Sequence, residues 1–218
     1  MNRPKICAVT VNKDLRAIRA IEPLVELFEV RIDLIGDGWS EVVKQLNQPW
    51  IACNRSADEG GSWRGEETKR IDELLKAVEL GADIIDIELA TRDLARVVPL
   101  IKEKARCLLS FHEFNRTPPL SEMRGIVQRE LDAGADICKV VTTAQRPEDN
   151  LAVLQLVADF PQTRMVSLAM GPLGLTSRIL CPLVGGDFTY ASMEKGKESA
   201  SGQITVTELR KLYDMVQE

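Results

Sequence analysis

A lysine within an apolar segment is the residue of this chain best placed for covalent chemistry. Lys139 lies in Ile137-Cys138-Lys139-Val140-Val141. If this segment is a strand buried on both faces, a charged ammonium there is costly, so it must find a partner, reach solvent or lower its pKa. An amine with a lowered pKa forms a Schiff base with a ketone or an aldehyde. The alternative is a structural lysine that reaches solvent or pairs with Glu88, and its position alone does not separate the two.

The only histidine of the chain favours the chemical interpretation. His112 ends the segment Cys107–His112, which precedes the Lys139 segment. Neighbouring strands lie about 4.8 Å apart, so the two side chains can converge on one small substrate. Imidazole transfers protons near neutral pH. A lone histidine is more often structural, but one that faces a strand lysine points to acid–base catalysis.

Further charged residues gather where strands are predicted to end. Arg55 and Glu59 lie in the loop Asn54–Gly61, where Glu59 is suited to orient His112. The alternative for this loop is a surface salt bridge, which suits Asp58 better.

Glu29, Arg31 and Asp33 alternate with apolar residues, which predicts one shared face with the arginine held between two carboxylates. A half-exposed antiparallel strand would show the same pattern. Arg178 is a candidate ligand for a carboxylate, although a surface arginine is commoner. The polar segment Met193–Gly202 is predicted to close over the pocket as a lid, or else to be a solvated loop.

Short β-type segments alternate with helical patterns along the whole chain. The predicted strands are Ile6–Val11, Phe28–Leu34, Trp50–Cys53, Asp83–Leu89, Cys107–His112, Asp136–Thr142, Arg164–Ala169 and a weaker segment, Gly186–Tyr190. Helical spacing of apolar residues is clearest in Glu66–Leu80, Leu120–Ala133, Pro147–Phe160 and Thr207–Gln217.

This alternation predicts an α/β fold, a (β/α)₈ TIM barrel formed by a single domain over residues 1–218. An open doubly wound sheet is the rival architecture, but it normally carries a glycine-rich phosphate loop, and no G-x-G-x-x-G occurs here. In a barrel, functional side chains come from the C-terminal ends of the strands, where the residues named above are predicted to lie.

Composition excludes several classes of protein. The 218 residues carry 28 Lys and Arg against 33 Asp and Glu, a net charge of −5, which argues against broad binding of nucleic acid. Five scattered cysteines without C-x-x-C, and a single histidine, disfavour a metal site or a disulfide framework. No apolar run approaches the ~20 residues that a membrane span needs. A cytoplasmic protein without a membrane segment is expected.

Six separated motifs occur in an order that resembles the type I 3-dehydroquinate dehydratase (3-dehydroquinase) family over nearly the whole chain. They are Glu29-x-Arg31-x-Asp33, Arg55-x-x-x-Glu59-Gly60-Gly61, Ser110-Phe111-His112-Glu113-Phe114, the Lys139 segment, Met170-Gly171-x-x-Gly174-x-x-Ser177-Arg178 and Ser199-Ala200-Ser201-Gly202-Gln203.

The resemblance implies a barrel that is usually a homodimer and removes water from 3-dehydroquinate to give 3-dehydroshikimate, in the shikimate pathway, without a metal or an organic cofactor. It implies that Lys139 forms an imine with the substrate ketone, that His112 transfers the protons and that Glu59 holds His112. Substrate-binding roles are implied for six further motif residues, Glu29, Arg31, Arg55, Arg178, Ser199 and Gln203.

Two features depart from the family pattern, and both concern the lid. Ser201 replaces a common proline, and Tyr190–Ser199 is about two residues longer than in the best-known bacterial members, with Tyr190 expected as a pocket wall. Two other functions share part of this residue set. A Schiff-base aldolase shares the lysine but does not predict a carboxylate clamp, and a catalytically dead scaffold would be expected to lose Lys139 or His112 first.

Overall fold

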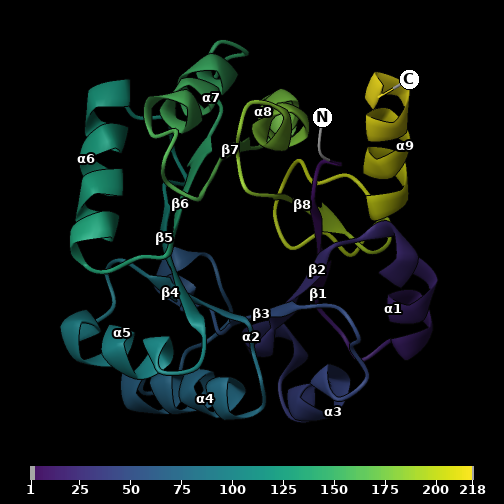
Figure 1. Ribbon diagram of the computed structural model, residues 1–218, viewed down its shortest axis with the longest axis vertical. Helices are drawn as coiled ribbons and strands as arrows, with labels where there is room; N and C mark the ends of the chain where they lie inside the picture. Colours follow the sequence, from purple (N-terminus) through teal and green to yellow (C-terminus); the bar gives the residue numbers. More distant parts are fainter. Residues whose placement is uncertain (1–2, 218) are drawn as a thin grey trace.

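Eight parallel strands form a nearly closed barrel with helices around it (Figure 1), which confirms the predicted (β/α)₈ architecture. The computed structural model describes residues 3–217, so three positions of the predicted 1–218 domain lie outside the described residues. The hydrogen-bonded order is β7-β6-β5-β4-β3-β2-β1-β8. The strands are β1 Ile6–Thr10, β2 Leu27–Arg31, β3 Trp50–Cys53, β4 Ile84–Glu88, β5 Arg106–His112, β6 Ile137–Thr143, β7 Met165–Met170 and β8 Thr189–Ser192.

The helices cover the outside of the barrel, as Figure 1 shows. They are α1 Leu15–Ile21, α2 Ile32–Ile35, α3 Trp39–Val43, α4 Glu67–Glu79, α5 Leu94–Lys102, α6 Leu120–Asp132, α7 Asp149–Asp159, α8 Leu175–Leu180 and α9 Val206–Gln217. Short 3₁₀ turns, η1 Glu22–Leu24, η2 Ala57–Glu59, η3 Pro172–Gly174 and η4 Cys181–Leu183, supplement them. The four helices predicted by residue range correspond to α4, α6, α7 and α9. Within residues 3–217, none of the helices has the length and apolar character needed to cross a membrane.

The last strand lies later in the chain than predicted. The expected strand Gly186–Tyr190 is replaced by β8, because residues up to 188 form a turn after η4 in which Gly186 N donates to Cys181 O at 2.9 Å. This turn also bridges the seam between β7 and β8, the two ends of the hydrogen-bonded order. Asp187 N donates to Met165 O at 2.8 Å, and the Asp187 carboxylate pairs with Arg164 at 2.6 Å.

Side chains that point into the barrel form successive layers. The lowest layer is apolar and includes Leu27, Ile51, Ile84, Leu108 and Ile137. Two residues further along the same strands, the next interior positions hold Glu29, Cys53, Asp86, Ser110 and Lys139. Because side chains alternate along a strand, this spacing of two puts a polar layer directly on an apolar base. The base keeps water from the lower side of that layer.

The five cysteines, Cys7, Cys53, Cys107, Cys138 and Cys181, are all free and buried, where cysteine packs as a small hydrophobic residue. Burial raises the pKa of each thiol, to about 12 for Cys107 and for Cys181. At neutral pH all five are therefore protonated and poorly nucleophilic.

A carboxylic acid lies in the apolar layer between α6 and the barrel. Glu130 is fully buried, and within residues 3–217 its carboxyl oxygens have no well-formed hydrogen bond, although the Cys138 thiol and the Lys139 backbone lie nearby and oppose the effect of burial on its pKa. Burial raises the pKa of Glu130 well above its usual value. The unfolded chain releases this proton near pH ~4.3, whereas the folded chain retains it. The stability that this group contributes is therefore complete below that pH and is lost as the pH rises through the raised folded-state pKa.

Replacing Glu130 by an apolar side chain is expected to stabilise the protein. We expect Glu130→Met to raise the free energy of unfolding by about 1–3 kcal/mol near pH 8 and by less near pH 4, as measured by urea titration. Glu122→Met, on the exposed face of the same helix, is the control and should change stability little. An equal gain at both pH values would contradict the ionisation argument.

Candidate active site

A pocket opens at the C-terminal ends of the strands and encloses about 520 Å³, its mouth included. All nine site residues predicted from the sequence line it, namely Glu29, Arg31, Arg55, Glu59, His112, Lys139, Arg178, Ser199 and Gln203. The lining also includes Cys53, Val141 and Leu168, for which the sequence predicts no role, and the motif residues Met170 and Ala200. The expected pocket wall Tyr190 also lines it. One cavity therefore gathers residues that are up to 174 positions apart (203 − 29).

The Lys139 ammonium lies in the pocket wall between two carboxylates. Its Nζ donates to Asp86 Oδ2 at 2.7 Å and lies 3.6 Å from Glu29 Oε1. Burial by itself would lower the pKa of Lys139, but these two carboxylates outweigh it, so the pKa is raised above its usual value. Lys139 is therefore an ammonium held by carboxylate partners, so the paired alternative is the correct one and the lowered pKa is wrong.

The alternative pairing of Lys139 with Glu88 is also wrong. Glu88 lies two residues beyond Asp86 on β4, one interior layer higher in the barrel, where it accepts from Arg70 of α4 at 2.6 Å. Its other oxygen accepts from Ser56 N at 3.0 Å and lies 3.4 Å from Arg55. Glu88 thus holds the loop after β3 and is not available to the lysine.

Asp86 is a site residue whose importance the sequence did not reveal. Its Oδ1 accepts from Arg55 and from Ser110 Oγ, each at 2.7 Å, while Oδ2 accepts from Lys139. Although burial alone would raise the pKa of Asp86, Arg55 and Lys139 hold it below its usual value. The available signal was the spacing of two from Glu88 on the predicted strand, which points both carboxylates into the barrel.

His112 and Glu59 form a hydrogen-bonded pair at the pocket wall, with Nδ1 and Oε2 separated by 3.0 Å. Burial, reinforced by the nearby charges of Arg55 and Lys139, holds the pKa of His112 well below its usual value. The imidazole is therefore neutral. When Glu59 is ionised, Nδ1–H donates to it and the lone pair of Nε2 is free to accept a proton. Burial raises the pKa of Glu59 itself to about 7, although Arg55 opposes this.

The loop that carries Arg55 and Glu59 folds tightly on itself. Gly61 N donates to Ser56 O at 2.8 Å, and a Cβ on Gly61 would lie 2.0 Å from Arg55 O. Gly60 has a φ of +75°, and a Cβ there would collide with the Phe114 ring, which stacks on His112. Glycines are required at both positions, and the resulting turn presents Glu59 to the imidazole.

Arg31 does not lie between two carboxylates as predicted. It pairs with Asp33 through two hydrogen bonds, at 2.9 and 2.7 Å, whereas Glu29 faces Lys139. The reason is that β2 ends at Arg31 and α2 begins at Ile32, so Asp33 is on a helix. The predicted strand Phe28–Leu34 and its single charged face are corrected accordingly.

Arg178 is a buried cation at the pocket wall, on the short helix α8. It is 3% exposed, and no carboxylate of residues 3–217 lies within salt-bridge distance of it. Within residues 3–217 the guanidinium forms one hydrogen bond, from Nη2 to Ser201 O at 3.2 Å, and its Nε has no hydrogen-bond partner. Burial lowers the pKa of Arg178 to about 10, which leaves it charged at neutral pH. A buried guanidinium in this state favours an anion in the pocket.

Two residues of the predicted lid Met193–Gly202, Ser199 and Ala200, line the pocket, whereas Met193 belongs to the hydrophobic core. Gly171 N donates to Ser201 O at 3.1 Å, and a Cβ on Gly202 would lie 2.3 Å from Gly171 O. The lid backbone therefore rests directly on the turn after β7. Ser199 and Gln203 bond to each other, with Gln203 Nε2 donating to Ser199 Oγ at 3.0 Å. Both also line the pocket, so their polar ends can exchange this bond for one to a ligand.

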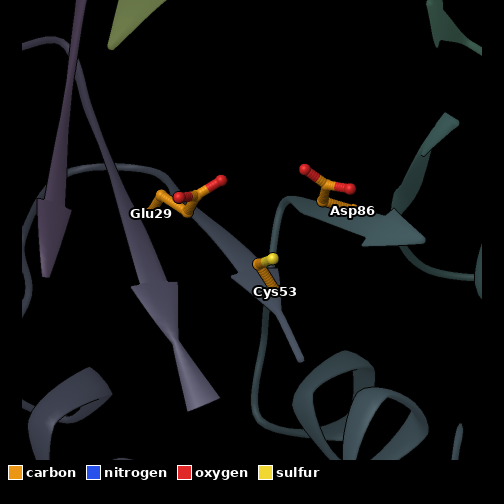
Figure 2. A group of neighbouring side chains, drawn as sticks. All are labelled: Glu29, Cys53 and Asp86. Atoms are coloured by element: carbon orange, nitrogen blue, oxygen red, sulfur yellow. The ribbon is translucent and has the colours of Figure 1, made fainter. Parts of the chain in front are cut away.

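Three side chains at the barrel centre have the donor types of a metal site. Figure 2 shows Glu29, Cys53 and Asp86 on three neighbouring strands, and their ligand atoms lie within 4.8 Å of one another. The Lys139 ammonium already bonds to one carboxylate and lies near the other, and burial raises the pKa of the Cys53 thiol. This set does not fit a divalent ion, because cations already neutralise the carboxylates and the sulfur is protonated.

The sequence is similar to known proteins over nearly its whole length. The family model for type I 3-dehydroquinase matches residues 5–218. A 3-dehydroquinate dehydratase of Dehalococcoides mccartyi is 40% identical over 213 residues, covering 98% of this chain and 96% of the relative. One of Methanosarcina mazei is 34% identical over 227 residues, covering 97% and 94%.

Among solved structures, the 3-dehydroquinate dehydratase of Geobacillus kaustophilus superposes with a TM-score of 0.85 at 27% identity, covering 99% of this chain and 92% of that one. The family match therefore covers nearly every residue, and the site residues predicted from the sequence all line one pocket of the barrel. The chain belongs to the type I 3-dehydroquinase family.

Proposed function

We propose that this protein is a Schiff-base-forming dehydratase, a hydro-lyase that converts 3-dehydroquinate to 3-dehydroshikimate and water, the third step of the shikimate pathway. The observation that carries the proposal is the placement of Lys139 Nζ in the wall of a pocket that also presents a neutral imidazole and an Arg178 guanidinium with no carboxylate partner among residues 3–217. These three groups match a substrate with a ketone, an acidic C–H beside it and a carboxylate. Family membership and the names of the relatives support the same substrate.

The first step is attack of Lys139 Nζ on the substrate ketone. The resting ammonium must first release a proton, and Glu29 Oε1, 3.6 Å away and without a hydrogen-bond partner among residues 3–217, is well placed to accept it. A carbinolamine forms, and the former carbonyl oxygen leaves as water. The positively charged imine then withdraws electrons from the neighbouring C–H bond.

His112 performs the proton transfers that follow. Its neutral imidazole removes a proton from the carbon beside the imine, which gives an enamine and an imidazolium. The enamine expels the hydroxyl from the next carbon, and the imidazolium protonates that oxygen so that it leaves as water. Hydrolysis of the conjugated imine releases the enone and restores the lysine. Glu59 fixes the ring through Nδ1 during both transfers.

The substrate carboxylate is assigned to Arg178. We expect Arg178→Met to raise KM about 30- to 200-fold, the equivalent of a charge-assisted pair worth 2–3 kcal/mol, with a smaller change in kcat. Arg164→Met is the control, because Arg164 pairs with Asp187 at the opposite end of the barrel. Steady-state kinetics measure both constants, and an unchanged KM in Arg178→Met would remove the carboxylate assignment.

Borohydride trapping tests the proposed function. Added with 3-dehydroquinate, it is expected to reduce the imine to a stable amine whose mass, after peptide mapping, lies on Lys139. Without borohydride, the purified chain should produce the absorbance of a conjugated enone. Full dehydration with an unmodified Lys139 would overturn the imine mechanism, and the absence of both signals would overturn the activity.

Location and oligomeric state form the last part of the proposed function. We propose that the enzyme acts in the cytoplasm as a homodimer, as the family resemblance implies. Sedimentation equilibrium at micromolar concentration tests the dimer, and a monomer of unchanged activity would contradict it.

A further inference from the structure

An aromatic ring contacts the Lys139 ammonium in addition to its two carboxylates. Nζ lies 4.3 Å from the centroid of the Tyr190 ring, within cation–π distance. Tyr190 comes from β8, is 5% exposed and lines the pocket. The edge-to-face contact with Phe188, at 5.3 Å and 75°, holds the ring from below. The reacting nitrogen therefore has the face of the Tyr190 ring beside it, and that ring is fixed by its packing against Phe188.

We propose that the π face of Tyr190 is a catalytic group of this site, which stabilises the positively charged imine formed at Lys139 Nζ. This inference rests on the proposed function and deepens it, because it assigns a residue to the charged intermediate. Neither the pocket wall expected from the sequence nor the proton transfers of His112 require such a role.

The chemistry of imine formation explains why a ring is needed as well as carboxylates. Counting from the ammonium, two of its three hydrogens leave with the carbonyl oxygen as water, and the protonated imine keeps one N–H. The imine nitrogen can therefore donate to only one of Asp86 and Glu29. Its positive charge persists, and the attraction to a ring quadrupole depends on that charge and needs no N–H donor. Because the site is shielded from water, this attraction is stronger than at a surface.

The ring face, and not the hydroxyl, is the feature that acts. The Tyr190 hydroxyl is buried and has no hydrogen-bond partner within residues 3–217. Removing a polar group that has no partner is nearly neutral or stabilising. Tyr190→Leu, which removes the π face, should therefore lower kcat about 5- to 30-fold, and Tyr190→Phe, which keeps the ring, should lower it clearly less.

A graded change in the ring provides the decisive test. Phenylalanines carrying one, two or three ring fluorines can replace Tyr190, which weakens the negative potential of the ring face step by step while nearly preserving its shape. The same series in place of Phe188 is the matched control, since that ring packs against Tyr190 and does not line the pocket. For each protein we would measure kcat, KM and the amount of borohydride adduct on Lys139.

We expect log kcat to fall with each added fluorine at position 190, with KM nearly constant, and to stay level for the series at position 188. If log kcat did not change with fluorination at either position, the role of the ring would be overturned. Equal falls in log kcat at positions 190 and 188 would overturn it too, because a packing effect alone would produce them. A loss above tenfold in Tyr190→Phe would transfer the role to the hydroxyl and also overturn the inference. Failure of the proposed function is separate, because it would appear as no borohydride adduct in the unmodified protein.

Discussion

Lys139→Met is expected to lower kcat/KM by roughly 10⁴–10⁶-fold, because the nucleophile of a covalent mechanism is removed and the remaining groups act only through it. The same variant should give no borohydride adduct with 3-dehydroquinate. It should also be less stable by about 3–5 kcal/mol, since Asp86 and Glu29 lose the cation that lies between them. Activity is therefore to be measured on protein whose folded fraction is known from circular dichroism.

Lys139→Arg separates the chemical role of the lysine from its structural role. The guanidinium keeps a positive charge beside the two carboxylates but is not a nucleophile at neutral pH. We expect it to be as inactive as Lys139→Met and more stable. Activity within tenfold of the unmodified protein in either variant would show that Lys139 serves only as a buried ion-pair partner.

His112→Ala is expected to lower kcat by about 10²–10⁴-fold, the usual contribution of a group that transfers protons. Imine formation precedes those transfers, so the borohydride adduct on Lys139 should persist in this variant. Steady-state rates and the mass of the trapped peptide measure the two effects separately.

Glu59→Gln is the matched control for His112→Ala. The amide oxygen can still accept from Nδ1 at this position, so the ring stays oriented and only the negative charge is lost. The fall in kcat should therefore be smaller than for His112→Ala. An unchanged kcat in His112→Ala would show that another group moves the protons, and loss of the adduct would show that the imidazole is needed for the imine itself.

Sequence reasoning identified the residues of the pocket better than it identified their partners. His112 could be found because parallel strands of a barrel all end at the same face, which makes a strand-end residue a site candidate wherever it lies in the chain. Lys139 lies inside β6 and could be found because a charged side chain within an apolar strand is costly unless it has a role. The partner of Lys139 could not be found this way. Asp86 and Glu88 both point inward, and only the stagger of the strands decides which of them reaches the lysine.

The same limit explains the errors at strand ends. Asp33 continues the alternation of charged and apolar residues seen in β2. The helix α2 begins at Ile32, however, so the strand periodicity no longer predicts where the Asp33 side chain points. The predicted strand Gly186–Tyr190 begins before β8 because contacts of Gly186 and Phe188 with Cys181 of η4 hold the residues before Thr189 in a turn. The hydrogen bond from Arg178 to the Ser201 carbonyl of the lid is likewise a tertiary contact that no local sequence pattern encodes.

The protected state of the five native cysteines has a practical consequence for studying the lid. Since every one of them is buried and protonated, a thiol introduced on the exposed lid, as in Lys197→Cys, should be the fastest site of maleimide coupling. A fluorophore or spin label can then be attached without first deleting natural sulfur atoms. Opening and closing of the lid during turnover thereby becomes accessible to time-resolved spectroscopy on otherwise unaltered protein.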